Sequence, residues 1–339
     1  MRTAIVTGLI AAVVVAILLV GNNMENGPNP FVSVGLVNGA IFGLVALGLV
    51  LVYKGTRVFN FAQGEFGTLA AYFVFLTTAS EGPLTGLNLP LGAGIVVGLA
   101  GAVAVGLIME RLIVRPLLSS PRITLLVATI AVALLFIGIE ILVFRVDPLN
   151  LVPVMEPQSS TGDIRGITLF GLPIAPQRLI AVGVLLALGV LLAYFFSRTD
   201  LGLAVLATSQ DAFATRVVGI GVERMSKFIW GGAALLGGIA GILYVPIAGA
   251  LLPGIMTSNI LIPAFTGAVL GGMTSLPGAF VGGLVVGLIQ SLSLWATGYF
   301  TVGGKLIGEI VPGGEQISII FALLVVLTIR PQGLLGTEA

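Results

Sequence analysis

The stretch "FVSVGLVNGAIFGLVALGLVLVY", from Phe31 to Tyr53, decides the fold class, because none of its residues is charged. A helix that crosses a membrane needs about 20 predominantly apolar residues to span about 30 Å of hydrocarbon. Strands of a membrane barrel alternate apolar and polar residues with period two, and this run does not alternate. The stretch therefore predicts a transmembrane helix.

The whole chain has the same character. Of its 339 residues, 57% are hydrophobic and only 9% are charged, whereas soluble domains carry about 25% charged residues. The mean hydropathy is +1.16. Because the surface of a soluble globule needs polar cover, the solvent for most of this chain must be lipid.

The composition also limits the chemistry. The net charge of +1 gives no electrostatic reason to bind nucleic acid. The chain has no Cys and no His, so it lacks thiolate chemistry and the commonest general base and metal ligand. We therefore expect no catalytic residue, no metal site and no cofactor bound by this chain.

Ten apolar segments predict an all-α integral membrane protein, a polytopic helix bundle of about ten spans. The first segment resembles a signal peptide, but its length and the lack of an A-x-A site favour a retained helix. The eighth and ninth could be a re-entrant pair, which would leave eight crossings; we favour ten. The segments are 4–20, 31–53, 63–79, 91–110, 123–144, 178–197, 226–247, 259–271, 278–296 and 316–329.

The positions of Lys and Arg predict the orientation. If the N-terminus is cytoplasmic and the spans alternate, most of the 15 basic residues fall on the cytoplasmic side. Both termini are then cytoplasmic. We treat 1–339 as one transmembrane domain with a cytoplasmic loop at 198–225 and a Pro-rich outer loop at 145–177.

The cytoplasmic loop contains "LATSQDAFATRVVGIGVERMSK", residues 206–227. Residues 210–218 have the pattern of a short helix, with Ser209 as N-cap, Asp211 in the first turn, Arg216 in the last turn and Gly219 just beyond it. A helix that only lies on the bilayer would carry more Lys and Arg. We therefore favour a helix that docks in a groove of a partner protein.

Two other regions carry polar or helix-breaking residues. The turn "NFAQGE" holds Asn60, Gln63 and Glu65 at the start of a short apolar span. Their side chains either satisfy broken helix ends or shape a pathway, because intramembrane carboxyl groups often mark function. For Glu140, we favour pairing with Arg145 or an outward-reaching side chain over a pathway role.

The segment 259–283 is broken by Pro and Gly. Discontinuous helices at membrane depth offer free backbone N–H and C=O groups to a zwitterion, so Pro263, Thr266 and Ser275 are further pathway candidates. The glycines of this and other spans have a simpler explanation, close helix packing at small-xxx-small spacing. Three such stripes are Gly35-x3-Gly39-x3-Gly43, Gly237-x3-Gly241 and Gly278-x3-Gly282.

Three blocks make the chain resemble the permeases of branched-chain amino-acid ABC transporters. The block "GLVNGAIFGLVALGLVLVYKGTRVFNFAQGEFGTLAAY" (35–72) contains the family's N-F-A-x-G-E turn, with Gln63 where His is frequent. The block "FTGAVLGGMTSLPGAFVGGLVVGLIQ" (265–290) resembles its A-V-L-G-G-x-x-S-x-P-G-A motif, and "RPQGLLG" (330–336) its ending. The likeness covers about 31–336.

The resemblance also bears on the cytoplasmic loop. The family's acidic residue eight positions before a G-I pair is matched by Asp211 ahead of Gly219 and Ile220, whereas Thr215 stands where Ala is expected. The resemblance therefore implies that the ATPase-coupling residues are Ser209, Gln210, Asp211, Phe213, Arg216, Gly219 and Ile220. It leaves Asn60, Gln63, Glu65, Pro263, Thr266 and Ser275 as candidates for the translocation pathway or its gate.

The resemblance implies a multi-pass permease subunit in a bacterial plasma (inner) membrane. Its implied partners are a second, homologous or identical permease, two ATP-binding cassette subunits and an extracytoplasmic binding protein. The sequence agrees, because the only G-G-K, at 303–305, lacks the G-x-x-x-x-G-K-[ST] pattern of a phosphate-binding loop. ATP and Mg²⁺ would then be bound by the partner subunits.

Several alternatives for the function stay open. The implied solute is a branched-chain or other small apolar amino acid, moved by alternating access; within the family, urea or a short amide is the alternative. Outside the family, the alternative is a stand-alone secondary transporter. That class predicts ion-coupling acids deep in the spans, and this chain offers only Glu140 and Glu65.

Overall fold

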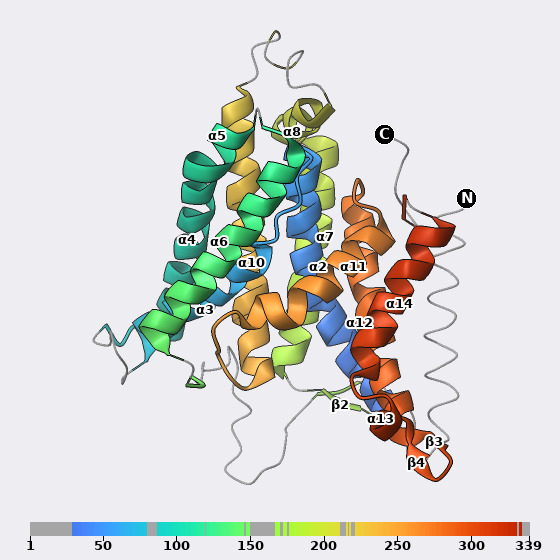
Figure 1. Ribbon diagram of the computed structural model, residues 1–339. Coiled ribbons are helices and arrows are strands. Elements are labelled where there is room, and N and C mark those ends of the chain that lie inside the picture. Colours follow the sequence, from blue (N-terminus) through green and yellow to red (C-terminus); the bar gives the residue numbers. More distant parts are fainter. Residues whose placement is uncertain are drawn as a thin grey trace. The chain divides into compact units, whose positions relative to one another are not determined.

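The computed structural model shows an almost wholly helical chain (Figure 1). It divides into two compact units that are described separately below. Unit 1 comprises Met1–Gly43, Pro157–Leu185 and Pro263–Ala339, and unit 2 comprises Leu44–Glu156 and Leu186–Ile262. The structure describes residues 29–79, 87–118, 120–145, 147–149, 167–169, 172–174, 176–210, 215, 217, 221–330 and 332–333.

Two long helices contribute to both units, because the divisions fall within them. They are α2 (Asn29–Thr56) and α7 (Pro176–Arg198). The other helical elements of unit 2 include two π-helical turns, η1 and η2. The set is α3 (Gln63–Thr78), α4 (Leu91–Met109), η1 (Glu110–Val114), α5 (Arg115–Leu117), α6 (Arg122–Phe144), α8 (Asp200–Gln210), α10 (Val222–Ala248) and η2 (Thr257–Leu261).

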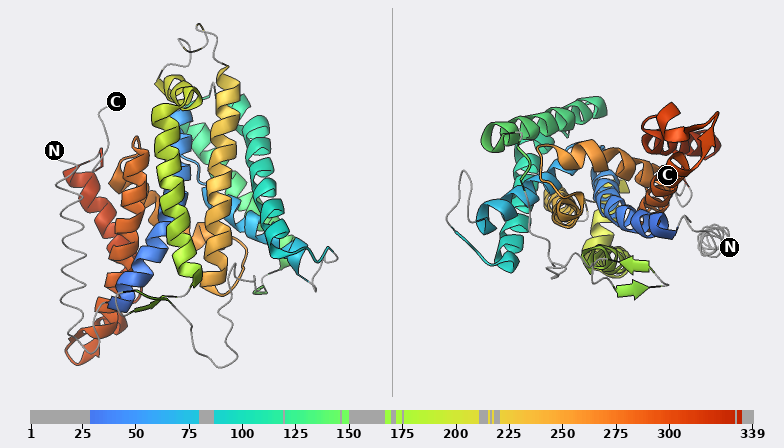
Figure 2. Two further views of the ribbon diagram at one scale, coloured as in Figure 1. Left: turned by 180° about the vertical axis from the view of Figure 1, so that it is seen from behind. Right: turned by 90° about the horizontal axis from the view of Figure 1, so that it is seen from below.

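The centre of unit 2 is formed by α3, α4 and α10, which pack against one another. Figure 2 shows from behind how α10 lies beside α4. The helices approach closely because their contact surfaces are made of small residues. A methyl group added at Gly241 of α10 would collide with the backbone of Gly67 in α3. The close packing predicted for the Gly237–Gly241 stripe is therefore confirmed.

Unit 1 contains the start of α2, four short strands and the C-terminal helices. Of these helices, α12 packs against α14 and α13. The two strand pairs, β1–β2 and β3–β4, are antiparallel hairpins. The elements are β1 (Ile167–Leu169), β2 (Leu172–Ile174), α11 (Ile262–Gly271), α12 (Leu276–Tyr299), β3 (Thr301–Val302), β4 (Lys305–Leu306), α13 (Ile307–Ile310) and α14 (Gly314–Ile329).

The other two glycine stripes also make close helix contacts, within unit 1. Carbon atoms added at Gly35 and Gly39 of α2 would lie 2.9 Å from the carbonyl oxygens of Gly287 and Leu284 in α12. Likewise, Gly278 and Gly282 of α12 face the backbone of α11 at Gly271 and Gly267. Close packing, the role favoured from the sequence, is therefore confirmed for all three stripes.

Five described helices are long and apolar enough to cross a membrane, which supports the prediction of a polytopic membrane protein. They are Phe31–Thr56, Leu91–Leu117, Arg122–Phe144, Val222–Ala248 and Leu276–Tyr299. Shorter apolar helices include Thr257–Gly271 and Gly314–Ile329. The count of ten spans and the cytoplasmic placement of both termini stay predictions. The segment 4–20 lies outside the described residues.

The structure adds elements that the sequence analysis did not predict. The described part of the 145–177 loop includes the β1–β2 hairpin, and Leu149 forms an isolated bridge with Leu251. The predicted break in 259–271 takes the form of the π-helical turn η2 followed directly by α11. Pro263 lies inside the continuous helical stretch Thr257–Gly271, directly after the π-helical turn. A local π-helical adjustment is one way in which a membrane helix accommodates a proline.

Candidate functional site

The turn before α3 is fixed by a chain of side-chain hydrogen bonds. Asn60 donates from Nδ2 to Oε1 of Gln63 at 3.2 Å and accepts from the backbone N–H of Ala62 at 3.1 Å. Gln63 in turn donates from Nε2 to the carbonyl oxygen of Ala233 in α10 at 2.8 Å. Both side chains are fully buried. The turn is therefore anchored to α10 by its own polar groups.

Two glycines make room for Gln63. A side chain at Gly48 of α2 would collide with the Gln63 amide, and one at Gly237 of α10 would lie 3.1 Å from its Nε2. One of their bonds, from the backbone N–H of Ala62 to Asn60, satisfies a backbone group at the broken helix end, whereas the bond from Gln63 to Ala233 joins the turn to the interior of α10. A role in a pathway stays a proposal.

Glu65, in the first turn of α3, is fully buried. Its carboxyl group lies against the carboxyl group of Glu140 in α6 and against the hydroxyl groups of Thr68 and Thr257. Neither Glu65 oxygen accepts a hydrogen bond from a backbone N–H or a side-chain donor among the described residues. Residues of α3, α6 and the start of η2 thus meet around one acidic side chain.

The role favoured for Glu140 from the sequence is wrong. Its side chain is fully buried, so it does not reach outward, and in the described part of the chain it makes no ion pair with Arg145. Instead, its Oε2 accepts a hydrogen bond of 2.9 Å from the backbone N–H of Gly254. Arg145 is the C-cap of α6, with a φ of 62° that directs the chain away from the helix.

The remaining pathway candidates, Pro263, Thr266 and Ser275, belong to unit 1. Pro263 and Thr266 are buried in α11, and the hydroxyl of Thr266 has no hydrogen-bond partner. Ser275 is the N-cap of α12, where its Oγ accepts from the backbone N–H of Gly278 at 3.1 Å. Capping of α12 explains the presence of a serine at position 275. The hydroxyl of Thr266 makes no hydrogen bond that would explain it in the same way.

The predicted N-cap at Ser209 is wrong. Residues 200–210 form α8, so Ser209 lies in the last turn of that helix. The apolar run before it continues the helix, and Thr208 is accommodated because its hydroxyl donates to the carbonyl oxygen of Ala204. Gln210 is the last residue of α8. The other predicted coupling residues, Asp211, Phe213, Arg216, Gly219 and Ile220, lie outside the described residues.

Two neighbours within the same segment are described. Thr215 is buried, with 4% of its surface exposed, whereas Val217 is 72% exposed. Both are helical.

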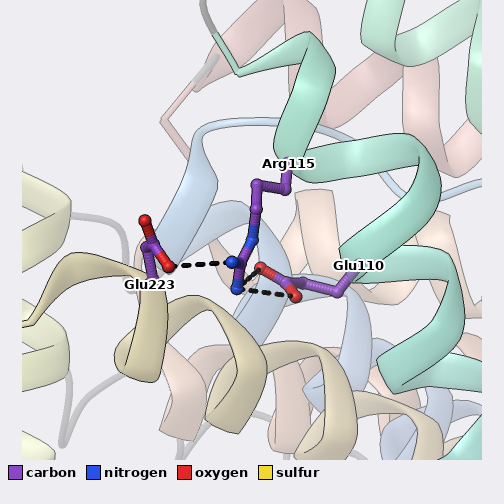
Figure 3. A network of polar contacts seen from close by, with 3 residues as sticks. All are labelled: Glu110, Arg115 and Glu223. Atoms are coloured by element: carbon purple, nitrogen blue, oxygen red, sulfur yellow. Dashed lines mark hydrogen bonds and ion pairs between the residues drawn. The ribbon is translucent and has the colours of Figure 1, made fainter.

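A charge network in unit 2 includes the first turn of α10, which follows this segment in the sequence (Figure 3). Arg115 of α5 donates from Nη1 to Glu223 in the first turn of α10 at 2.8 Å, and its Nη2 lies 3.5 Å from Glu110 of η1. Glu110 is fully buried, whereas the Glu223 side chain is 68% exposed. The network therefore ties the start of α10, directly after the 211–220 segment, to the end of α4.

Sequence reasoning missed this network, because Glu110 and Arg115 stand at a helix end and have the pattern of ordinary boundary charges. The signal that could have found it is the spacing of the two residues. Arg115 follows Glu110 by five positions, which is the spacing of hydrogen-bonded residues in a π-helix. The π-helical turn η1 spans Glu110–Val114, directly before Arg115. Within the described residues, no group of three or more acidic side chains could hold a metal ion.

The comparisons with known proteins agree with this architecture. Residues 31–329 match the family described as branched-chain amino acid transport system / permease component. Two curated relatives are the high-affinity branched-chain amino acid transport system permease proteins BraD of Pseudomonas aeruginosa and LivH of Escherichia coli K12. BraD is 28% identical, covering 89% of this chain and 94% of its own length, and LivH is 29% identical, covering 89% and 93%.

A third relative comes from an archaeon. The probable branched-chain amino acid transport permease protein LivH of Methanocaldococcus jannaschii is 30% identical over 87% of this chain and 88% of its own. No solved structure matches. The match to the family over most of the chain, together with the apolar spans, shows that this protein belongs to the permease components of branched-chain amino acid transport systems.

Proposed function

We propose that this chain forms the translocation pathway of an ATP-driven importer for branched-chain or other small apolar amino acids. The observation that carries the proposal is the family match over residues 31–329. The relatives are named as branched-chain amino acid permeases. The spans also carry few charges, which suits the passage of a zwitterion.

The proposed assembly contains partners that supply energy and solute. They are a second permease subunit, two ATP-binding cassette subunits on the cytoplasmic side and an extracytoplasmic binding protein. This division of labour is supported by the sequence, which lacks a phosphate-binding loop. The bundle would then alternate between outward-open and inward-open states as the ATPase subunits close and open.

The segment 209–220 is the proposed contact with the ATPase subunits. It begins in the last turn of α8 and precedes α10, whose first turn is held to η1 through Arg115. A displacement of this segment would therefore be passed to α10, and from α10 to α3 and α4, which pack on it. The exposed Val217 supplies apolar contact area for a partner.

The proposed pathway and gate residues are Glu65, Pro263 and Thr266. The buried Thr266 hydroxyl has no partner within its own unit, so it is available to a solute or water molecule. Asn60, Gln63 and Ser275 would act indirectly, since their bonds position α3 and α12.

The experiment that tests the coupling proposal replaces Gly219 by Val. The sequence places Gly219 just beyond a helical turn, where a left-handed conformation is expected and a β-branched residue resists it. The variant is expected to insert normally but to lose uptake of labelled leucine and the stimulation of ATP hydrolysis in the reconstituted complex. Transport at the wild-type rate with normal stimulation would refute the docking assignment.

The matched control is Gly221→Val, two residues further along. Gly221 has φ −74°, and an added carbon there would meet only the Arg224 side chain, at 3.6 Å. Uptake by this variant is expected to stay near the wild-type rate. Copurification of the variant complexes in mild detergent then separates loss of docking from loss of the partner subunits.

A further inference from the structure

Two acidic side chains, Glu65 and Glu140, are buried between α3 and α6, and the proposed transport cycle gives a role only to Glu65, as a pathway candidate. Glu65 and Glu140 are both fully buried, and their carboxyl groups contact each other directly. In the part of the chain that the structure describes, neither makes an ion pair, since the only acidic residues that do are Glu110 and Glu223, both with Arg115.

Neutral polar groups surround the pair on every described side. The N–H of Gly254 donates to Glu140, and the hydroxyls of Thr68 and Thr257 lie beside Glu65. Tyr72 also faces the pair and is 1% exposed, yet its hydroxyl makes no hydrogen bond. Among the described residues, Tyr72 is the only other titratable side chain that faces both carboxyl groups.

Several polar atoms of this cluster are buried without a partner. Both oxygens of Glu65, one oxygen of Glu140 and the hydroxyls of Tyr72 and Thr257 are buried without a hydrogen bond. Two ionised carboxylates in contact cannot both persist in a buried site, because like charges repel strongly where water does not screen them. A positive ligand must therefore accompany them.

The make-up of the cluster indicates which ligand this is. Hard cations prefer about six or more oxygen ligands, and among the described residues no group of three or more acidic side chains could hold a metal ion. A proton needs no such set of ligands, because a protonated carboxyl group donates one O–H bond to the neighbouring carboxylate. The pair then keeps one negative charge, which Gly254 stabilises through its N–H.

We propose that Glu65 and Glu140 bind one proton between them and so form an acid–carboxylate pair that joins α3 to α6 and to the 252–257 segment. The proton-binding site lies entirely within unit 2. It does not depend on the identity of the transported solute. Any movement that separates α3 from α6 would expose the carboxyl groups and release the proton.

Infrared spectroscopy of the full chain in an alkyl maltoside detergent, which has no carbonyl group, tests the proposal at neutral pH. A protonated carboxyl group has a carbonyl stretching band that a carboxylate lacks, and this band is expected in the wild-type protein. It should be lost in the double variant Glu65→Gln/Glu140→Gln. The matched control, Glu309→Gln, replaces an exposed glutamate and should leave the band at its wild-type intensity.

The single variants keep the test decisive if the double variant does not fold. In either Glu65→Gln or Glu140→Gln, the amide donates a hydrogen bond to the remaining carboxylate, so no proton is needed and the band should again be lost. Absence of the band from the wild-type protein would overturn the proposal. So would a band that appears only when sodium and potassium ions are removed, because a metal cation would then be the natural ligand.

Discussion

The crossing of α3 and α10 supports a quantitative prediction for Gly241→Ala. A methyl group at Gly241 would collide with the carbonyl oxygen and the α-carbon of Gly67. In the opposite direction, a carbon added at Gly67 would lie 2.8 Å from the carbonyl oxygen of Gly237. Because backbone rather than a flexible side chain lies on both sides, the helices must move apart to accept the methyl group.

Two opposing terms set the size of the effect. Overpacking a filled core costs about 1–3 kcal/mol, and the rigid neighbours at Gly241 favour the upper end. Alanine gains about 1 kcal/mol over glycine inside a helix. The expected net loss is therefore about 2 kcal/mol, which corresponds to a fall of roughly 4–8 °C in the melting temperature if unfolding resembles that of domains of 150–250 residues.

The assay is thermal unfolding of the purified protein in one detergent, and Gly138→Ala is the matched control. Gly138 also lies inside a helix, α6, but an added carbon there meets no atom within 4 Å. Its variant should show only the gain in helix propensity, up to about 1 kcal/mol. The two variants are thus expected to shift the melting temperature in opposite directions.

The reasoning would be refuted if Gly241→Ala melted at or above the temperature of Gly138→Ala. That result would mean that α3 and α10 separate without cost, so that their close contact contributes nothing to stability. An equal loss in both variants would instead point to an effect of the substitution on helices in detergent, and would equally remove the packing argument.

Three further predictions address the network, the cap and the energy source. Arg115→Ala should cost about 1–3 kcal/mol of stability, because it leaves the buried Glu110 without its partner. Glu223→Gln should cost at most about 1 kcal/mol, because the Glu223 side chain is exposed. Equal losses of stability in a melting experiment would contradict this prediction. Ser275→Ala should lose about 1 kcal/mol and Ser275→Asn should retain it, since both Ser and Asn cap helices; the test fails if the two variants melt alike. The purified chain alone should hydrolyse no ATP in a phosphate-release assay, and measurable turnover would contradict the missing phosphate-binding loop.

The spans were predictable because their signal is local. The length and polarity of a run such as Phe31–Tyr53 can be read directly from consecutive residues. The helix α2 extends only a few residues beyond this run at each end. The glycine stripes were predictable for the same reason, since spacing along one helix decides which face is small. What faces the stripe was not predictable, because Gly67 and Gly241 are far apart in sequence.

The errors concern residues whose surroundings come from distant parts of the chain. Arg145 is the nearest cation to Glu140 in sequence, yet the partners of Glu140 are Glu65 and Gly254. Ser209 has the pattern of an N-cap, but α8 continues through it because the preceding apolar run is already helical. Local patterns predict which groups need partners, whereas tertiary structure determines which partners they find.

The position of Gln63 limits how the membrane helices can move. Its amide is enclosed by Gly48 and Gly237 and held by Ala233. A slide of α2 along α3 by one helical turn would bring Leu44 or Val52 to the place of Gly48. On α10, the residue one turn after Gly237 is again a glycine, Gly241, so the restraint there comes from the hydrogen bond to Ala233. The amide therefore fixes the register of α3 against α10 and against the part of α2 that belongs to the same unit.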